Sequence, residues 1–238
     1  MVAPVAERCK LAAAIRSGLV AEWHDTTEEY LSTILELKEE GVVPLRARLV
    51  ERLGVSAPAV SETVNRLVEQ GLAELLDDRS LRLTTEGRRI ATSVVRRHRL
   101  AERLLLDVIG LEWEKVHREA ARWEHVISDD VEKRLVALLG DPATCPHGNP
   151  IPGSSRPAPG GRTVPLSGAR TGPVTIRRIS ERLETDDAAL GMLARLDLVP
   201  GREATVEGRG TGGVKVATAG GVHLIPDPVA DLILVSTG

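Results

Sequence analysis

The sequence predicts a mainly α protein with small β parts, and three observations lead to this fold class. Apolar residues recur at helical spacing through most of residues 27–139. Eight prolines and six glycines then occupy the 33 positions of residues 141–173, a composition typical of a linker. From residue 174 onward, short β-like segments are separated by glycines. We therefore expect helical domains, a linker and a small, mostly β module.

The N-terminal part, residues 21–92, predicts a winged helix-turn-helix domain. Segments with helical apolar spacing span residues 27–40, 44–54 and 56–71, and strand-like segments span residues 72–76 and 81–84. The second of these helices stops at Gly54, and the third has Ser56 as an N-cap and Pro58 in its first turn. Two helices joined by a short glycine-containing turn form a helix-turn-helix, and the two strands predict a β-hairpin wing.

The charge distribution of this domain favours DNA. The whole chain has a net charge of −3, but residues 41–100 contain eleven Arg, no Lys and seven acids. Positive charge neutralises phosphates, and the second helix of such a motif reads the bases. Each residue taken singly could equally be a helix cap or a solvated charge. The residues expected at the DNA are Thr26, Arg46, Arg48, Ser56, Pro58, Ala59, Ser61, Glu62, Arg66 and Arg79.

The next part, residues 93–141, predicts a helical domain that carries a cluster of imidazoles and carboxylates. Its two helical segments span residues 86–109 and 112–139, separated near Gly110. The cluster consists of His98, Glu102, His117, Glu124 and His125. Spacings of four residues and of about two helical turns place members of this set on common helix faces. They could form one metal site, two metal sites, or simply hydrogen-bonded and partly buried pairs.

The remaining composition limits the class of protein. Residues 1–20 are expected to be a loose extension, residues 142–172 a Pro/Gly-rich linker, and residues 173–238 the β module. The two cysteines are far apart, which excludes a disulfide framework. Charged residues interrupt the apolar N-terminal stretch, so neither a signal peptide nor a membrane span is expected. The expectation is a reduced, cytoplasmic protein without membrane association.

Seven motifs, ordered along residues 22–153, carry a specific resemblance. They are Asp25-Thr-Thr-Glu-Glu-Tyr-Leu31, Pro44-Leu-Arg-Ala-Arg48, Asp78-Arg-Ser-Leu81, Arg97-His-Arg-Leu-Ala-Glu-Arg-Leu-Leu105, Val116-His117, Arg122-Trp-Glu-His125 and Gly148-Asn-Pro-Ile-Pro-Gly153. They are similar to the diphtheria toxin repressor family of iron-dependent or manganese-dependent transcriptional regulators, and the similarity weakens in the tail. The resemblance implies a winged helix, a helical dimerisation and metal domain, and a C-terminal SH3-like β-barrel.

The resemblance also implies two metal sites. An ancillary site would use His98, Glu102 and His117, completed by Glu184 and Asp187 of the third domain. A primary, activating site would use Glu29, Glu124 and His125, with Ala121 contributing its backbone carbonyl only. His24, His147 and His223 are expected to lie outside both sites.

Two residues of the primary site depart from the iron-sensing branch. That branch has a methionine at the position of Glu29 and a cysteine at the position of Ala121. Oxygen ligands in place of sulfur favour Fe²⁺, with Mn²⁺ as a close alternative, and other divalent transition metals could substitute in vitro. The manganese-sensing branch has an acid at both positions, so the site matches neither branch.

The function implied is a metal-dependent repressor of metal-uptake and metal-homeostasis genes, and not an enzyme. Metal that bridges Glu29 to Glu124 and His125 would favour a DNA-competent homodimer. The apolar residues of 100–111 and 126–139 would form the dimer surface. A palindromic operator with half-sites about one helical turn apart, bound by one or two dimers, is expected. One alternative is a metal-independent DNA-binding regulator with a decayed primary site, and a remote one is a metal-dependent hydrolase.

Two further expectations concern the reading helix and the linker. The family commonly has glutamine at the position of Glu62 and arginine at that of Glu69, and each carboxylate repels phosphate. Glu62 could instead accept a hydrogen bond from a cytosine amino group. The segment Arg156-Pro-Ala-Pro-Gly-Gly161 could dock on the SH3-like domain or act as a plain flexible tether.

Overall fold

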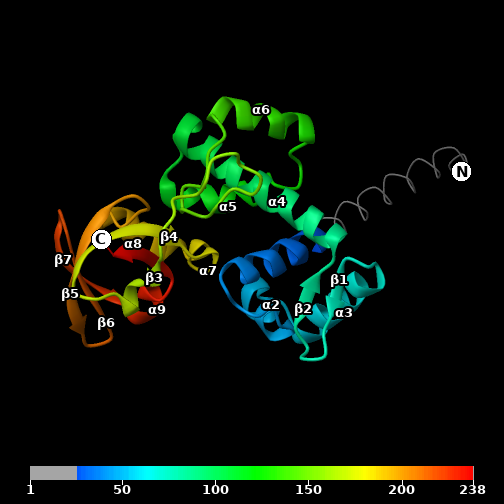
Figure 1. Cartoon of the computed structure of the whole chain (residues 1–238), viewed down its shortest axis with the longest axis horizontal. Helices are drawn as coiled ribbons and strands as arrows, with labels where there is room; N and C mark the ends of the chain where they lie inside the picture. Colours follow the sequence, from blue (N-terminus) through cyan, green and yellow to red (C-terminus); the bar gives the residue numbers. More distant parts are fainter. Residues whose placement is uncertain (1–25, 238) are drawn as a thin grey trace, which may run out of the picture. The chain divides into compact units, whose positions relative to one another are not determined.

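The computed structural model describes residues 26–237, so the expected loose extension of residues 1–20 and His24 lie outside the described residues. The chain divides into two compact units, Met1–Val94 and Val95–Gly238. Each unit is described by itself, and Figure 1 labels their helices and strands. None of the helices within residues 26–237 has the length and apolarity that a membrane span needs.

The described part of the first unit is a winged helix-turn-helix, as the sequence predicts. Its elements are a helix over residues 26–39, α2 (Arg46–Leu53), α3 (Ala57–Glu69), β1 (Ala73–Leu75), β2 (Leu81–Leu83) and the first half of α4 (Thr85–Leu104). Gly54 ends α2 in the left-handed conformation, at φ 67°, and the Ser56 hydroxyl caps α3 by accepting from the Ala59 amide. The two strands pair antiparallel, with Ala73 opposite Leu83. Leu31, Leu49, Val60, Val64 and Leu67 are buried in this unit.

The helical part of the second unit differs from the expected pair of long helices. The second half of α4 passes into one π-helical turn (Leu105–Ile109), followed by a 3₁₀ turn (Trp113–Lys115), α5 (Val116–Ala120) and α6 (Asp129–Leu139). The prediction of one continuous helix over residues 112–139 is therefore wrong. Turns occupy residues 121–126, and the Ser128 hydroxyl starts α6 by accepting from the Val131 amide. Serine at this position favours a new helix start over continuation of the old one.

The C-terminal part of the second unit is an antiparallel sheet with short helices (Figure 1). The strands are β3 (Val164–Pro165), β4 (Gly172–Ile179), β5 (Glu203–Gly210), β6 (Gly213–Thr218), β7 (Gly221–Pro226) and β8 (Ile233–Thr237), and the helices are a 3₁₀ turn (Leu166–Gly168), α7 (Glu181–Glu184), α8 (Asp187–Arg195) and α9 (Asp227–Ala230). The strand order is β3-β8-β4-β5-β6-β7, and every neighbouring pair is antiparallel. Its core consists of aliphatic side chains such as Ile176, Leu190, Leu193 and Val216, as a chain without Phe requires.

Part of the Pro/Gly-rich segment is packed into the second unit. Four residues of this segment are buried: Cys145, His147, Asn149 and Ile151. A flexible tether would leave such residues exposed to solvent. The His147 carbonyl accepts from the Ile179 amide at 2.8 Å, so this segment runs against the end of β4. At Gly148, φ is +86° and a Cβ atom would lie 2.1 Å from the Arg177 carbonyl oxygen. Glycine is therefore required at this close approach, and the segment is a fixed wall of the second unit.

Candidate metal centre

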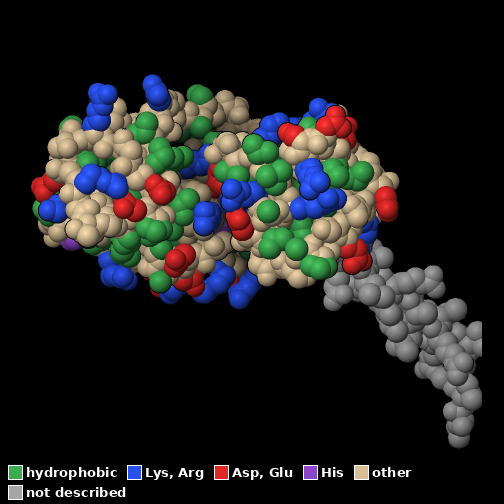
Figure 2. All heavy atoms as spheres, turned by 90° about the horizontal axis from the view of Figure 1, so that it is seen from below, with side chains coloured by type: hydrophobic (Ala, Val, Ile, Leu, Met, Phe, Trp, Pro, Cys, Tyr) green, Lys and Arg blue, Asp and Glu red, His purple; other side chains and the backbone are tan. Residues whose placement is uncertain are grey.

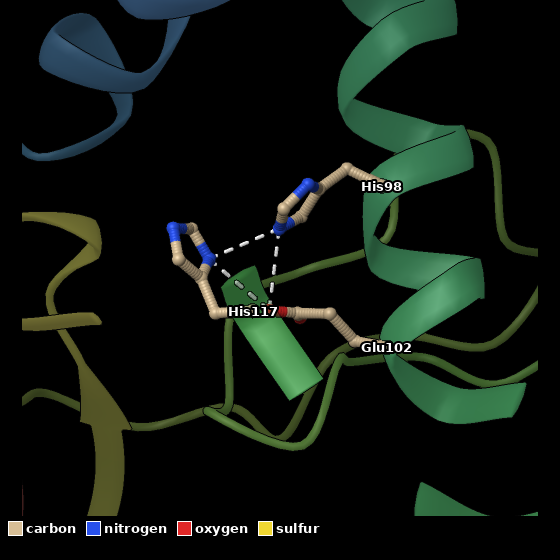
Figure 3. A group of neighbouring side chains, drawn as sticks. All are labelled: His98, Glu102 and His117. Carbon is tan, nitrogen blue, oxygen red and sulfur yellow. Dashed lines mark hydrogen bonds and ion pairs between the residues drawn. The ribbon is translucent and has the colours of Figure 1, made fainter. Parts of the chain in front are cut away.

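Helices α4 and α5 bring three of the expected ligands together. His98 and Glu102 are four residues apart and face the same side of α4, and His117 comes from α5 (Figure 3). His98 Nε2 lies 3.0 Å from His117 Nδ1 and 3.2 Å from Glu102 Oε1. His117 Nδ1 lies 3.3 Å from the same carboxylate oxygen. Three side chains from two separate helices thus place ligand atoms within 3.0–3.3 Å of one another.

Two residues from the rest of the second unit complete the cluster. Glu184 of α7 places its Oε2 atom 3.1 Å from Nδ1 of both His117 and His147. His147, from the Pro/Gly-rich segment, also places Nδ1 3.2 Å from Glu102 Oε1. The sequence interpretation left His147 outside both metal sites because its segment has linker composition. The structure instead buries the residue completely beside the two carboxylates.

Unsatisfied polar atoms converge in this cluster. Glu102 and His147 have no exposed surface, and Glu184 is 2% exposed. Within the described residues, Glu102 Oε2, Glu184 Oε2 and His147 Nε2 are buried without a hydrogen-bond partner. Glu184 Oε2 is at ion-pair distance from two imidazoles, but it makes no hydrogen bond in the described structure. Buried polar groups are normally satisfied, so the two unsatisfied carboxylate oxygens, Glu102 Oε2 and Glu184 Oε2, fit a bound cation.

Electrostatics couple these groups strongly. Burial lowers the pKa of His117, but its contacts with the Glu102 and Glu184 carboxylates outweigh burial and raise this pKa to about 9. Burial also opposes the charged forms of His98 and His147, yet neighbouring carboxylates hold both pKa values well above the usual range. Burial and the charge of Glu102 raise the pKa of Glu184, but charged His147 and the contact with His117 outweigh them and lower this pKa to about 2. Without metal, protons on the imidazoles compensate the carboxylates.

Cys145 lies at the edge of the same cluster. Its Sγ is close enough to ligand atoms of Glu102 and His147 for the three to hold a metal ion. Burial raises the pKa of the thiol to about 12, with the charge of Glu102 acting in the same direction. The side chain is therefore a protonated thiol in the metal-free protein, and only a bound metal would favour its thiolate.

The buried carboxylates that the C-terminal part places at the cluster are Glu181 and Glu184. Asp187, expected as a ligand, lies outside the cluster, because its carboxylate pairs with Arg118 and both side chains are more than half exposed. Glu181 is 4% exposed and lies with His117 and Glu184 within reach of a single ion. The sequence interpretation missed Glu181. Ser180 caps α7, which puts Glu181 and Glu184 three residues apart on one short helix, and that spacing was the available signal.

A buried ion pair supports this arrangement. The Arg99 guanidinium donates to Glu181 Oε1 at 2.8 Å and to the Pro150 carbonyl at 2.5 Å, and Arg99 has no exposed surface. Burial and the charge of Glu184 raise the pKa of Glu181, and Arg99 opposes them. Arg99 thereby joins α4 to α7 and to the segment that carries His147.

Of the expected primary-site residues in the second unit, Glu124 contacts His98. Glu124 Oε2 is 2.5 Å from His98 Nδ1, and Glu124 Oε1 is 3.3 Å from His125 Nε2. Ala121 follows α5 and is exposed. Glu29 belongs to the first unit, on the helix over residues 26–39, where its carbonyl accepts from the Ser32 and Thr33 hydroxyls. The structure thus brings Glu124 and His125 together, and the role of Glu29 stays a prediction.

Five of the residues expected at DNA lie at the N-cap and in the first two turns of α3. Ser56, Pro58, Ala59 and Glu62 are exposed, and Ser61 is half-buried.

The arginines expected at DNA already have partners within the first unit. Arg46 donates to Asn65 and Arg66 donates to Thr63, so both guanidiniums are partly engaged. Arg48 pairs with Glu51, Thr26 begins the first described helix, and Arg79 sits exposed in the hairpin turn at φ 64°. Basic and acidic side chains are intermixed on the face that Figure 2 draws.

Comparisons with known proteins agree with this combination of a winged helix-turn-helix and a His/Glu metal cluster. Residues 22–81 match the family model "Iron dependent repressor, N-terminal DNA binding domain". Residues 84–153 match the model "Iron dependent repressor, metal binding and dimerisation domain". The chain belongs to the iron-dependent repressor family.

Individual relatives extend the similarity beyond these two models. The chain is 48% identical over 206 residues to the iron-dependent repressor IdeR of Mycobacterium tuberculosis, which covers 82% of this chain and 90% of the relative. It is 48% identical over 193 residues to the diphtheria toxin repressor of Corynebacterium diphtheriae, covering 78% and 85% respectively. A solved manganese-dependent transcriptional repressor in complex with manganese is 35% identical, with a TM-score of 0.78 over 89% of this chain and 100% of that chain. These relatives are transcriptional repressors rather than enzymes.

Proposed function

We propose that this protein is a metal-dependent, DNA-binding transcriptional repressor activated by Fe²⁺ or Mn²⁺. The observation that carries the proposal is a buried cluster of three imidazoles and two carboxylates, connected by contacts of 3.0–3.3 Å. Similarity to an iron-dependent and a manganese-dependent repressor supports the same function.

The donor set fits a borderline divalent ion. His98, Glu102, His117 and Glu184 would hold the metal, with His147 as a fifth candidate ligand. Imidazole nitrogen and carboxylate oxygen suit Fe²⁺ and Mn²⁺. A bound ion would supply positive charge in place of the imidazole protons and would satisfy the orphaned Glu102 and Glu184 oxygens. Both α4 and α7 contribute ligands, so binding would tighten the second unit.

DNA recognition is assigned to α3 of the first unit. Its first two turns expose small hydroxyl and apolar groups at Ser56, Pro58 and Ala59, which suit phosphate hydrogen bonds and thymine methyl contacts. Glu62 is exposed on the same helix, and its carboxylate can only accept hydrogen bonds. A cytosine amino group is the base-edge partner that such an acceptor favours.

The active form is proposed to be a homodimer on a palindromic operator. Val131 and Leu138 lie two turns apart on α6, 48% and 63% exposed, and line a shallow apolar hollow. Val108 and Ile109, each 56% exposed, add apolar surface at the π-helical turn. In a two-fold dimer this surface would meet its own copy. Repression of metal-uptake genes would follow from operator binding at high metal.

The second ligand set expected from the sequence, Glu29, Glu124 and His125, is retained as a proposal for the activating site. Metal at that site would act through its differential affinity for the DNA-competent state. Metal titration of Glu29→Gln, with the neighbouring Glu28→Gln as the matched control, tests this assignment: an unchanged response of Glu29→Gln would remove Glu29 from the ligand set.

The deciding experiment measures DNA binding as a function of metal. A preferred sequence is first selected from random duplexes with Mn²⁺ present, and its affinity is then measured with Fe²⁺ under anaerobic conditions, with Mn²⁺ and with a chelator. We expect affinity to fall by about tenfold or more under chelation. Glu102→Gln should lose this metal response, and Glu112→Gln, an exposed control on the same unit, should keep it. Equal affinity with metal and with chelator would favour a metal-independent regulator.

A further inference from the structure

Besides the metal centre, the second unit contains a cavity of about 470 Å³ with three arginines in its wall. The lining combines the end of α4, the residue 144–150 segment, part of the Pro-rich segment and strand β4. Among residues 26–237, no Asp or Glu lines the cavity. The arginines are Arg103, Arg177 and Arg178. Its volume is in the range of pockets for small molecules.

Two of these arginines carry charge that no carboxylate balances. Arg177 donates through Nε to the Ser236 hydroxyl, and Arg178 donates through Nε to Asn149 Oδ1. Neither forms an ion pair with a carboxylate of the described residues. Arg178 Nη2 is buried without a hydrogen-bond partner among residues 26–237. A buried guanidinium donor without a partner is unfavourable, and an oxyanion would satisfy it.

The backbone explains how two consecutive arginines reach one cavity. Neighbouring residues on a regular strand point to opposite faces. The register of β4 against β8 shifts between Ile176 and Arg178, which marks a bulge at Arg177. A bulge re-aims side chains and lets adjacent residues share a side of the strand. Arg103 has a different role, because its guanidinium donates to the Thr144 and Cys145 carbonyls and fixes the opposite wall.

The remaining lining indicates an organic anion rather than a bare inorganic ion. Leu106, Trp113, Ile176 and Leu234 line the cavity together with several prolines. These apolar side chains would contact the short carbon skeleton of an organic anion, and the arginine guanidinium groups would bind its carboxylate or phosphate group.

One chain of contacts joins the cavity to the metal cluster. Asn149 is fully buried and accepts from Arg178 Nε. The Asn149 amide then donates to Glu184 Oε1 at 2.5 Å and to the Ile179 carbonyl at 3.1 Å. On the other side, the Trp113 ring lies 4.7 Å from the His147 ring, and Cys145 lines the cavity as well as the cluster. A ligand that moves Arg178 therefore acts on Glu184 through a single side chain.

We propose that this three-arginine cavity binds a small organic oxyanion, and that the anion regulates metal affinity through Asn149 and Glu184. The anion site stands independently of the repressor function, whereas the regulation rests on the proposed metal centre. Coupling of the two ligands is reciprocal, so the anion changes metal affinity by the same factor as metal changes anion affinity.

The first test measures anion binding to the metal-free full-length chain by calorimetry. The probes are succinate and glycerol 3-phosphate, which separate a carboxylate from a phosphate ligand. We expect saturable binding of at least one probe, weakened about tenfold in Arg178→Gln and in Arg177→Gln. The control Arg195→Gln, exposed on α8 and outside the cavity, should bind as wild type does.

Two results would overturn the anion site. One is no saturable binding of either probe up to about 10 mM. The other is equal binding by wild type, Arg177→Gln and Arg178→Gln, which would place the anion elsewhere. Thermal unfolding checks that the variants fold. If Arg178→Gln does not fold, the anion affinity of Arg177→Gln decides the test. Because no metal is present, these outcomes are independent of the metal-dependent DNA test.

The second test measures Mn²⁺ affinity with and without the probe that binds. We expect the probe to change the Mn²⁺ affinity of wild type severalfold. It should not change the Mn²⁺ affinity of Asn149→Ala, because this substitution breaks the connection between Arg178 and Glu184. An Mn²⁺ affinity in wild type that is the same with and without the probe would refute the regulation and leave only an anion site.

Discussion

Oε2 of Glu124 lies 2.5 Å from Nδ1 of His98, whose other ring nitrogen faces the metal cluster. Both nitrogens of this imidazole are therefore engaged, one by a carboxylate and one at the centre. A carboxylate on the outer nitrogen fixes the ring orientation and increases the basicity of the inner nitrogen. Glu124 thus supports the His98 centre, besides lying 3.3 Å from His125.

Replacing Glu124 with Gln should weaken metal binding at the His98 centre by about 10–100-fold. The amide keeps the size of the side chain but removes the charge that holds the ring. Calorimetric titration of Mn²⁺ into wild type, Glu124→Gln and the exposed control Glu112→Gln measures the effect. An affinity equal to wild type would show that the His98–Glu124 contact does not support the centre.

Metal binding near neutral pH should release protons. The pKa of His117, raised to about 9, keeps this imidazole protonated in the metal-free protein at pH 7, and a ligand must be neutral. Affinity should therefore rise with pH between about 7 and 9, by about tenfold per unit for each proton released. Calorimetry in buffers of different ionisation enthalpy counts the protons, and an observed enthalpy independent of buffer would contradict the expectation.

The sequence predicted the local elements well because their signals are local. The Ser56 cap, Pro58 and Gly54 define the turn between α2 and α3 without reference to the rest of the chain. The break between α5 and α6 was missed, because the apolar spacing continues through residues 121–128 although the backbone does not. A helical period alone does not distinguish one helix from two that share a core.

The cluster was predicted only where its residues share a helix or carry the family motif. His98 and Glu102 share α4 and lie in a family motif, and His117 lies in the family motif Val116-His117. His147 did not, because its Pro/Gly-rich surroundings have the composition of a linker, while burial there depends on contacts with β4. The sequence interpretation chose Glu184 and Asp187 and missed Glu181. Four neighbouring acids, at positions 181, 184, 186 and 187, offer more than one spacing, and only the structure shows which are buried.

His147→Gln should weaken metal binding at the cluster, although the composition of its segment gives no hint of this. The change removes an imidazole whose Nδ1 is 3.1–3.2 Å from Glu184 and Glu102, and whose Nε2 has no partner in the described residues. A loss of about tenfold in Mn²⁺ affinity is expected. His223→Gln, on β7 and outside the cluster, is the control. If both variants bind as wild type does, His147 only fills space.

Arg99→Met should destabilise the metal-free protein by about 3–5 kcal/mol, because Glu181 would remain buried without its partner. The double variant Arg99→Met with Glu181→Met removes both charges and should recover most of this loss. Arg122→Met, which breaks an exposed pair with Glu119, should change stability by less than about 1 kcal/mol. Urea unfolding gives all three values, and a double variant as unstable as Arg99→Met would show that the lost hydrogen bond to Pro150 dominates instead.

Leu138→Glu should weaken the proposed homodimer. Leu138 is 63% exposed and lies on the same face of α6 as Val131, beside an apolar hollow. A symmetric dimer would bury two copies of this side chain, so a charge there acts twice and should raise the dimer dissociation constant about a hundredfold or more. Sedimentation of wild type and Leu138→Glu with Mn²⁺ measures the shift, with Lys133→Glu on the same helix as a control for added acidic charge. A Leu138→Glu protein that stays as dimeric as wild type would move the interface away from α6.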